Sequence, residues 1–148
     1  MKPIDHLQTM ALTYQEICQG EQPWVPLGNF MNDWFDYKKE QRSELVATPL
    51  SLPETLSDEM FRWAVFCAAS VEYLCERYGV PCPSWVHNPT YHLPVPWFDS
   101  PMAHKPQVRK CLIQQTPEPF TKRNIYCGNR MFANKYELAE QHRRRATT

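Results

Sequence analysis

Glycine is scarce in this chain, with only four in 148 residues and no two of them close together. Loops that cradle a phosphate need several glycines within a few residues, because their backbone must approach the ligand closely. The sequence also lacks the G-x-S-x-G nucleophile elbow and the H-E-x-x-H zinc helix. No catalytic motif is present, so we expect a protein that is not an enzyme and has no cofactor.

The six cysteines lack the C-x-x-C pairs that structural zinc sites usually contain. The simplest interpretation is that most of them are buried free thiols. A metal site could be assembled from Cys82, His87, His92 and Asp99, but their spacing matches no known ligand pattern. We therefore expect no metal.

Long hydrophobic runs are absent as well. The longest uninterrupted apolar stretch covers residues 63–69, whereas a membrane-spanning helix needs roughly 20 such residues. The first residues contain no apolar segment of the kind that a secretory signal requires. These absences predict a cytoplasmic protein without a membrane partner.

The formal net charge is zero, but the charges are unevenly distributed. Residues 1–101 contain 6 Lys and Arg against 13 Asp and Glu, a balance of −7. Residues 102–148 contain 10 Lys and Arg against 3 Asp and Glu, a balance of +7. The basic third can bind the acidic N-terminal helices of its own chain, an acidic protein or a nucleic acid. The charge pattern alone leaves these three alternatives open.

Apolar periodicity predicts a fold that is all-α, or nearly so, in a single domain over residues 1–148. The strongest element is a helix near residues 55–78, with Thr55 or Ser57 as its cap and Gly79 as its end. Apolar residues cover most of its circumference, which is typical of the central helix of a bundle. Further helices are expected over residues 3–18, from Pro26 onward, over 106–115 and over 134–144, with a connection at 42–54. The helix at 106–115 is expected to turn Val108, Cys111 and Leu112 inward, and residues 124–126 to form a short extended piece.

Residues 81–101 contain six prolines and four aromatic residues. Proline excludes a long helix or a central strand here, while the aromatic side chains need a surface to pack on. We expect an ordered crossover over the core. Trp85, Trp97 and Phe98 either fill the bundle or form a rigid contact ridge for a protein partner.

Residues 122–132 mix cations, amides and aromatic rings, a composition that can bind phosphates and stack on bases. The arginine run near the C-terminus is the second basic element and is usual for a solvated helix end. The candidate residues for a partner or a nucleic acid are Lys122, Arg123, Asn124, Tyr126, Arg130, Arg143, Arg144 and Arg145.

Three segments together resemble a small bacterial helical domain: Arg77-Tyr78-Gly79-Val80-Pro81, Pro94-Val95-Pro96-Trp97-Phe98, and the run from Thr116 to Tyr126. That domain occurs alone or behind a helix-turn-helix in regulators, often in toxin–antitoxin settings. The resemblance covers residues from about 55 to 132 and carries no catalytic residues. It implies a regulatory, antitoxin-like protein whose partner is a toxin or another protein with an acidic surface. This chain has no recognisable helix-turn-helix of its own, and nucleic-acid binding is the alternative function.

Overall fold

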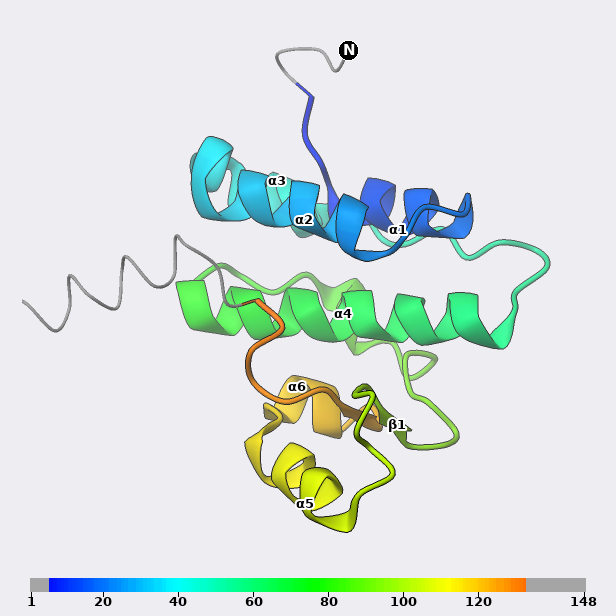
Figure 1. Cartoon of the computed structure of the whole chain (residues 1–148). Coiled ribbons are helices and arrows are strands. Elements are labelled where there is room, and N and C mark those ends of the chain that lie inside the picture. The colour runs from blue at the N-terminus through cyan, green and yellow to red at the C-terminus, as the bar shows by residue number, and fades with distance from the viewer. Residues whose placement is uncertain (1–5, 133–148) are drawn as a thin grey trace, which may run out of the picture.

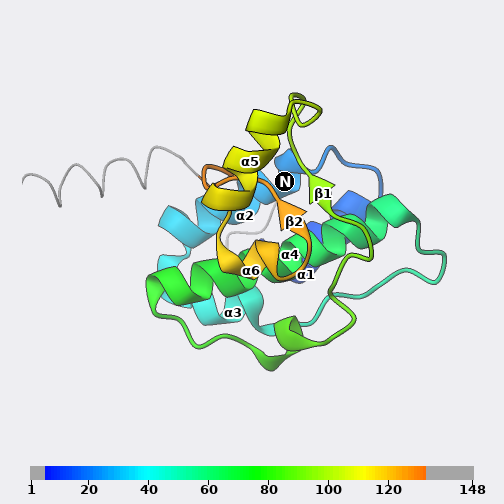
Figure 2. The same ribbon diagram turned by 90° about the horizontal axis from the view of Figure 1, so that it is seen from below.

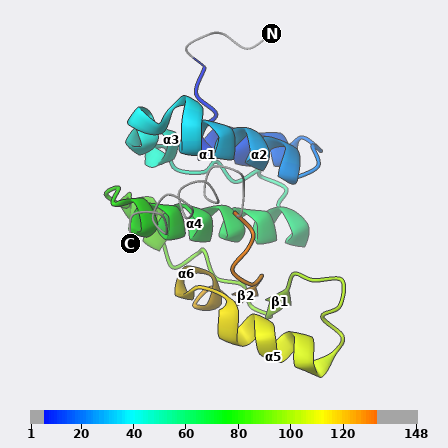
Figure 3. The same cartoon turned by 60° about the vertical axis from the view of Figure 1, so that its left-hand side comes forward.

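The computed structural model describes residues 6–132, which form three layers. The long helix α4 (Asp58–Tyr78) lies in the middle layer. The N-terminal helices lie on one side of it, and the C-terminal elements lie on the other (Figure 1). The view in Figure 3 shows the same order of layers. The expected bundle around a central helix is confirmed.

The N-terminal layer contains α1 (Met10–Cys18), α2 (Trp24–Asn32) and α3 (Arg42–Ala47). Helix α1 begins at Met10, later than the sequence predicted, because the Thr9 side chain accepts a hydrogen bond from the Leu12 amide and caps it there. The prediction that residues 42–54 form only a connection was wrong. Leu45 and Val46 are buried, and this burial stabilises the short helix α3 before Pro49 ends regular structure.

Helix α4 follows the sequence prediction closely. The Ser57 hydroxyl accepts a hydrogen bond from the Met60 amide, and Asp58 and Glu59 lie in the first turn, where negative charge is favourable. Gly79 ends the helix in the left-handed conformation, with φ of 69°. Between these caps α4 buries an almost continuous series of side chains from Trp63 to Cys75. It therefore supplies a surface to both outer layers.

The third layer contains β1 (Trp97–Phe98), α5 (Pro106–Gln115), α6 (Glu118–Thr121) and β2 (Ile125–Tyr126). The two short strands pair in parallel, with Trp97 opposite Ile125, and the two helices connect them. A view from below shows β1, β2 and α6 lying across α4, with α5 towards the edge (Figure 2). The expected extended piece at residues 124–126 is confirmed for Ile125 and Tyr126, which form β2, whereas the Asn124 backbone is left-handed, with φ of 69°.

An aromatic cluster centred on Phe66 joins the three layers. The ring of Phe66 lies 5.8 Å from Trp24 of the N-terminal layer, and 6.3 Å from Trp97 and 5.5 Å from Phe120 of the C-terminal layer. Trp63, one turn earlier, lies 5.4 Å from Trp97 in an edge-to-face arrangement. The crossover is therefore anchored in the core by its aromatic residues.

Helix α5 packs differently from the expectation. None of its ten side chains, all within the described part of the chain, is buried. Cys111 is exposed, and Val108 and Leu112 are half-buried, so the prediction that all three turn inward was wrong for Cys111. The helix expected at residues 134–144 lies outside the described residues. Within residues 6–132, the helices lack the combination of length and apolar character needed to cross a lipid bilayer.

Candidate functional site

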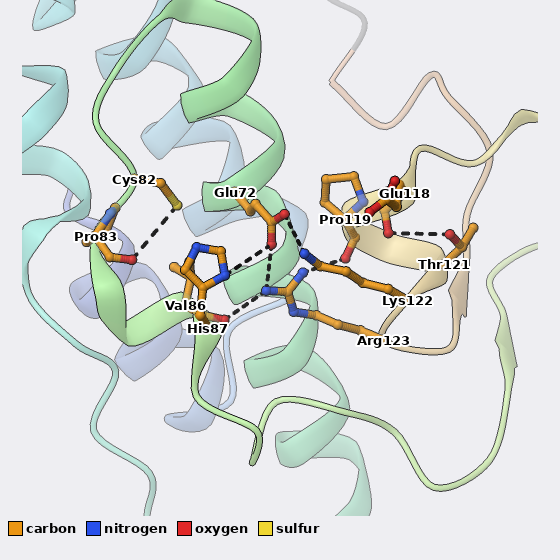
Figure 4. A network of polar contacts seen from close by, with 10 residues as sticks. All are labelled: Glu72, Cys82, Pro83, Val86, His87, Glu118, Pro119, Thr121, Lys122 and Arg123. Carbon is orange, nitrogen blue, oxygen red and sulfur yellow. Dashed lines mark hydrogen bonds and ion pairs between the residues drawn. The ribbon is translucent and has the colours of Figure 1, made fainter.

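The first cluster of charged residues surrounds Glu72, in the middle of α4. Lys122 Nζ lies 2.6 Å from Glu72 Oε2, and Arg123 Nη2 lies 2.8 Å from Glu72 Oε1 (Figure 4). His87 Nδ1 lies 3.9 Å from the same Oε1 atom. The side chains of Glu72 and Arg123 are only 6% and 5% exposed, so this ion pair is inside the protein.

Arg123 is fully engaged by the fold. Its Nη1 donates to the Pro119 carbonyl at 2.6 Å, and its Nη2 donates to the Val86 carbonyl at 2.8 Å. Burial on its own would raise the pKa of Glu72, but the hydrogen bonds and charges of Lys122 and Arg123 lower it below its usual value. The basic segment thus docks on its own chain. Its acidic partner belongs to the central helix and not to the N-terminal helices that the sequence suggested.

Two neighbouring candidates, Asn124 and Tyr126, are also used by the fold. Asn124 Nδ2 donates to the Leu93 carbonyl at 2.7 Å. The ring of Tyr126 stacks on Phe98 at 4.8 Å with 16° between the planes. Arg130 is exposed and pairs with none of the acidic side chains among residues 6–132. Arg143, Arg144 and Arg145 lie outside the described residues.

The three aromatic candidates of the crossover have mixed surroundings. Trp85 donates its indole N–H to the Val46 carbonyl at 2.8 Å, which attaches the crossover to α3. Trp97 packs on Trp63 and Phe66, yet it stays half-buried, as does Phe98. Trp85 and Trp97 therefore pack against the core, and all three residues are half-buried and also reach the surface.

That surface is a groove of about 460 Å³ between the first turns of α4 and the segment from Leu93 to Arg109. We call it the arginine–aromatic groove. Its lining includes Phe61 and Arg62 from α4, Pro94 to Phe98 from the crossover, and His104 and Arg109. Val95, at the rim, is 69% exposed. A partly open hollow that combines aromatic and apolar side chains with a few charged groups is a candidate binding site.

Two arginines lie over the aromatic rings of the groove. The guanidinium carbon of Arg62 lies 5.1 Å from the centre of a Trp97 ring, and that of Arg109 lies 4.7 Å from the centre of Phe98. Arg109 Nε also donates to the Ala103 carbonyl at 2.6 Å. These contacts hold the guanidinium planes in place, so their remaining N–H groups are available to a carboxylate or phosphate.

Sequence reasoning missed both Arg62 and Arg109. A signal for Arg62 was present, because it is a lone cation beside the apolar run of the central helix. Nothing in the sequence indicated that Arg109 would lie beside the same groove, since that depends on how the crossover turns back over α4.

Cys82, His87, His92 and Asp99, the residues considered for a metal site, do not form one cluster. His87 and His92 border a second hollow of about 330 Å³ together with Lys122 and Arg123. Among residues 6–132, no group of three or more His, Cys, Asp or Glu side chains is arranged to hold a metal ion. Burial raises the pKa of the Cys82 thiol, which makes it a weaker ligand at neutral pH.

In comparisons with models of protein families, with curated proteins and with solved structures, no match to this chain was found.

Proposed function

We propose that this protein is a non-enzymatic, antitoxin-like regulatory protein that binds a protein partner through the arginine–aromatic groove. The observation that supports the proposal is the combination of half-buried Trp97 and Phe98 with the guanidinium groups of Arg62 and Arg109 above them. Aromatic residues and arginines in a partly closed pocket are the residue types that dominate binding energy in protein interfaces. The regulatory role itself follows the resemblance given above.

The nucleic-acid alternative has less support. It relied on Lys122, Arg123, Tyr126, Arg130 and the arginines 143–145 as contacts to a phosphate backbone or a base. Arg130 is exposed, and the three terminal arginines lie outside the described residues. Arg123 is buried on Glu72, Lys122 pairs with the same carboxylate, and Tyr126 is covered by Phe98. We therefore give the protein partner priority.

The test is co-expression with the products of the neighbouring genes, with and without a charge placed at the groove. Val95→Glu puts a carboxylate at the rim, where the native side chain is 69% exposed and little stability is at stake. Tyr37→Glu is the matched control. Tyr37 is 68% exposed, and its neighbour Phe35 contacts Tyr78 at the other end of α4.

We expect a complex that survives purification with the native chain and with Tyr37→Glu, and that weakens at least about tenfold with Val95→Glu. Absence of a complex with every neighbouring product would contradict the proposed function. Equal binding by the two variants would contradict the groove as its contact surface.

A further inference from the structure

Helix α5 contributes Arg109 to the groove and, among residues 6–132, leaves Arg109, Lys110 and Ile113 exposed. It buries none of its side chains, and Ile113 is 52% exposed. Met102, just before the helix, is 42% exposed. Met102 and Ile113 lie before and after Arg109, a residue of the groove lining, so the segment next to the groove also carries exposed apolar side chains.

Helix α5 and the segment just before it contain no acidic residue. Residues 100–117 contain no Asp or Glu, while they contain His104, Lys105, Arg109 and Lys110. Arg109 and Lys110 lie on α5, and His104 and Arg109 line the groove. Arg62 adds a further cation from the side of α4. Arginines therefore lie on both sides of the groove and outnumber its one lining carboxylate, Asp58, so the excess charge complements an acidic ligand.

The geometry of the arginines suits carboxylates. Arg109 is held by its Nε bond to Ala103 and by its contact with Phe98, so its two terminal nitrogens keep a fixed direction. A guanidinium fixed in this way binds a carboxylate through two parallel hydrogen bonds, with little further loss of side-chain freedom.

A polyanion fits this surface less well than a peptide. Asp58 lines the groove close to Arg62, and Arg62 also acts on the carboxylate of Asp99. A nucleic acid carries a charge at every phosphate and would meet both carboxylates. A peptide can place one or two acidic residues beside the arginines and apolar residues over the rings.

We propose that the arginine–aromatic groove and the exposed face of α5 bind an extended acidic segment of the partner protein, in which Asp or Glu residues alternate with aromatic or aliphatic ones. This inference rests on the proposed function and specifies the chemistry of the partner.

The test is selection of a displayed library of random twelve-residue peptides on the purified full-length protein. Arg109→Glu is the test variant. Lys39→Glu is the matched control, because it makes the same kind of charge reversal on an exposed residue of the 3₁₀ turn Lys39–Gln41, in the opposite layer. Circular dichroism and the melting temperature of each variant show whether its fold is intact.

We expect the selected peptides to be rich in Asp and Glu next to Trp, Phe or Leu. The dissociation constant of a synthesised winner should rise at least about tenfold with Arg109→Glu and stay within about twofold with Lys39→Glu. Indole N–H and arginine Nε–H signals in an NMR titration should shift for Trp97, Arg62 and Arg109.

The inference is overturned if no peptide is enriched, if neutral or basic peptides are selected, or if Arg109→Glu binds the winner as tightly as the native chain. Tight binding of a labelled DNA or RNA oligonucleotide that Arg109→Glu abolishes would also overturn it, in favour of a nucleic acid. A complex with a neighbouring gene product could be weakened by Val95→Glu and unaffected by Arg109→Glu. That result would support the proposed function and contradict only the inference that the partner binds through an acidic segment.

Discussion

Replacing Glu72 by Gln should destabilise the protein by about 3 kcal/mol, the lower end of the cost of breaking a buried ion pair. Glu72 Oε1 faces Arg123 and Oε2 faces Lys122. The amide of Gln must therefore point its NH₂ group at one of two cations. Lys122 is 39% exposed and can turn towards water, whereas Arg123 is held inside the protein by the carbonyls of Val86 and Pro119. The uncompensated charge of Arg123 accounts for most of the expected loss.

Urea unfolding, followed by circular dichroism and tryptophan fluorescence, measures this loss. For a chain of this length, about 3 kcal/mol corresponds to a decrease in melting temperature on the order of 10 °C. The control is Lys122→Ala, which removes the exposed partner and should cost about 1 kcal/mol or less. A loss for Glu72→Gln no larger than that for Lys122→Ala would refute the argument that the buried pair is the important one.

A double replacement separates the charge from the shape of the site. Glu72→Met combined with Arg123→Met removes both buried charges and keeps similar volumes. Replacement of buried ion pairs by apolar residues is often neutral or stabilising. We expect the double variant to recover most of the stability lost by Glu72→Gln, although the Val86 and Pro119 carbonyls lose a donor.

Two further predictions concern pH and thiol chemistry. Because the pKa of Glu72 is lowered in the folded protein, its contribution to stability is fully present above the pKa of an unfolded Glu, about 4.3, and is lost as the pH falls through the lowered folded value. The difference in unfolding free energy between the native chain and Glu72→Gln should therefore shrink between pH 7 and pH 3, and an unchanged difference would contradict the assignment. Burial raises the pKa of the Cys75 thiol to about 12 and that of Cys67 as well, so Ellman's reagent at pH 8 should label exposed Cys111 first and reach Cys67 and Cys75 only after denaturation. Rapid labelling of Cys67 in the native protein would contradict the packing described here.

The central helix was predictable because all of its determinants are local. The Ser57 cap, the acidic first turn, the apolar circumference and Gly79 each act within a few residues along the chain. The start of α1 was misjudged because Pro3 and Ile4 fit a helical pattern equally well, and the Thr9 cap competes with that pattern. Helix α3 was missed because its six residues are too few for periodicity to show, and its stability comes from tertiary burial of Leu45 and Val46.

The candidate site was less predictable, since it depends on contacts between distant segments. The sequence around Lys122 and Arg123 has the composition of a binding site. In the fold, these two cations instead neutralise the carboxylate of Glu72, 50 positions before Lys122 in the chain. Arg62 and Arg109 belong to different helices. They line the same groove because the pairing of β1 with β2 places the crossover next to the start of α4. Local composition cannot distinguish a cation that the fold neutralises from one that it leaves at the surface.

The contacts of Lys122 and Arg123 with Glu72 change how the uneven charge distribution along the chain is interpreted. The basic third uses Lys122 and Arg123 to attach itself to α4, and this use requires a single carboxylate, Glu72. Within the described part of the chain, residues 6–132, the α5 cations Arg109 and Lys110 form no ion pair with an acidic side chain. Residues 122–126, which the sequence favoured as a binding site, instead attach the third layer to α4, and the proposed contact surface is the groove beside α5.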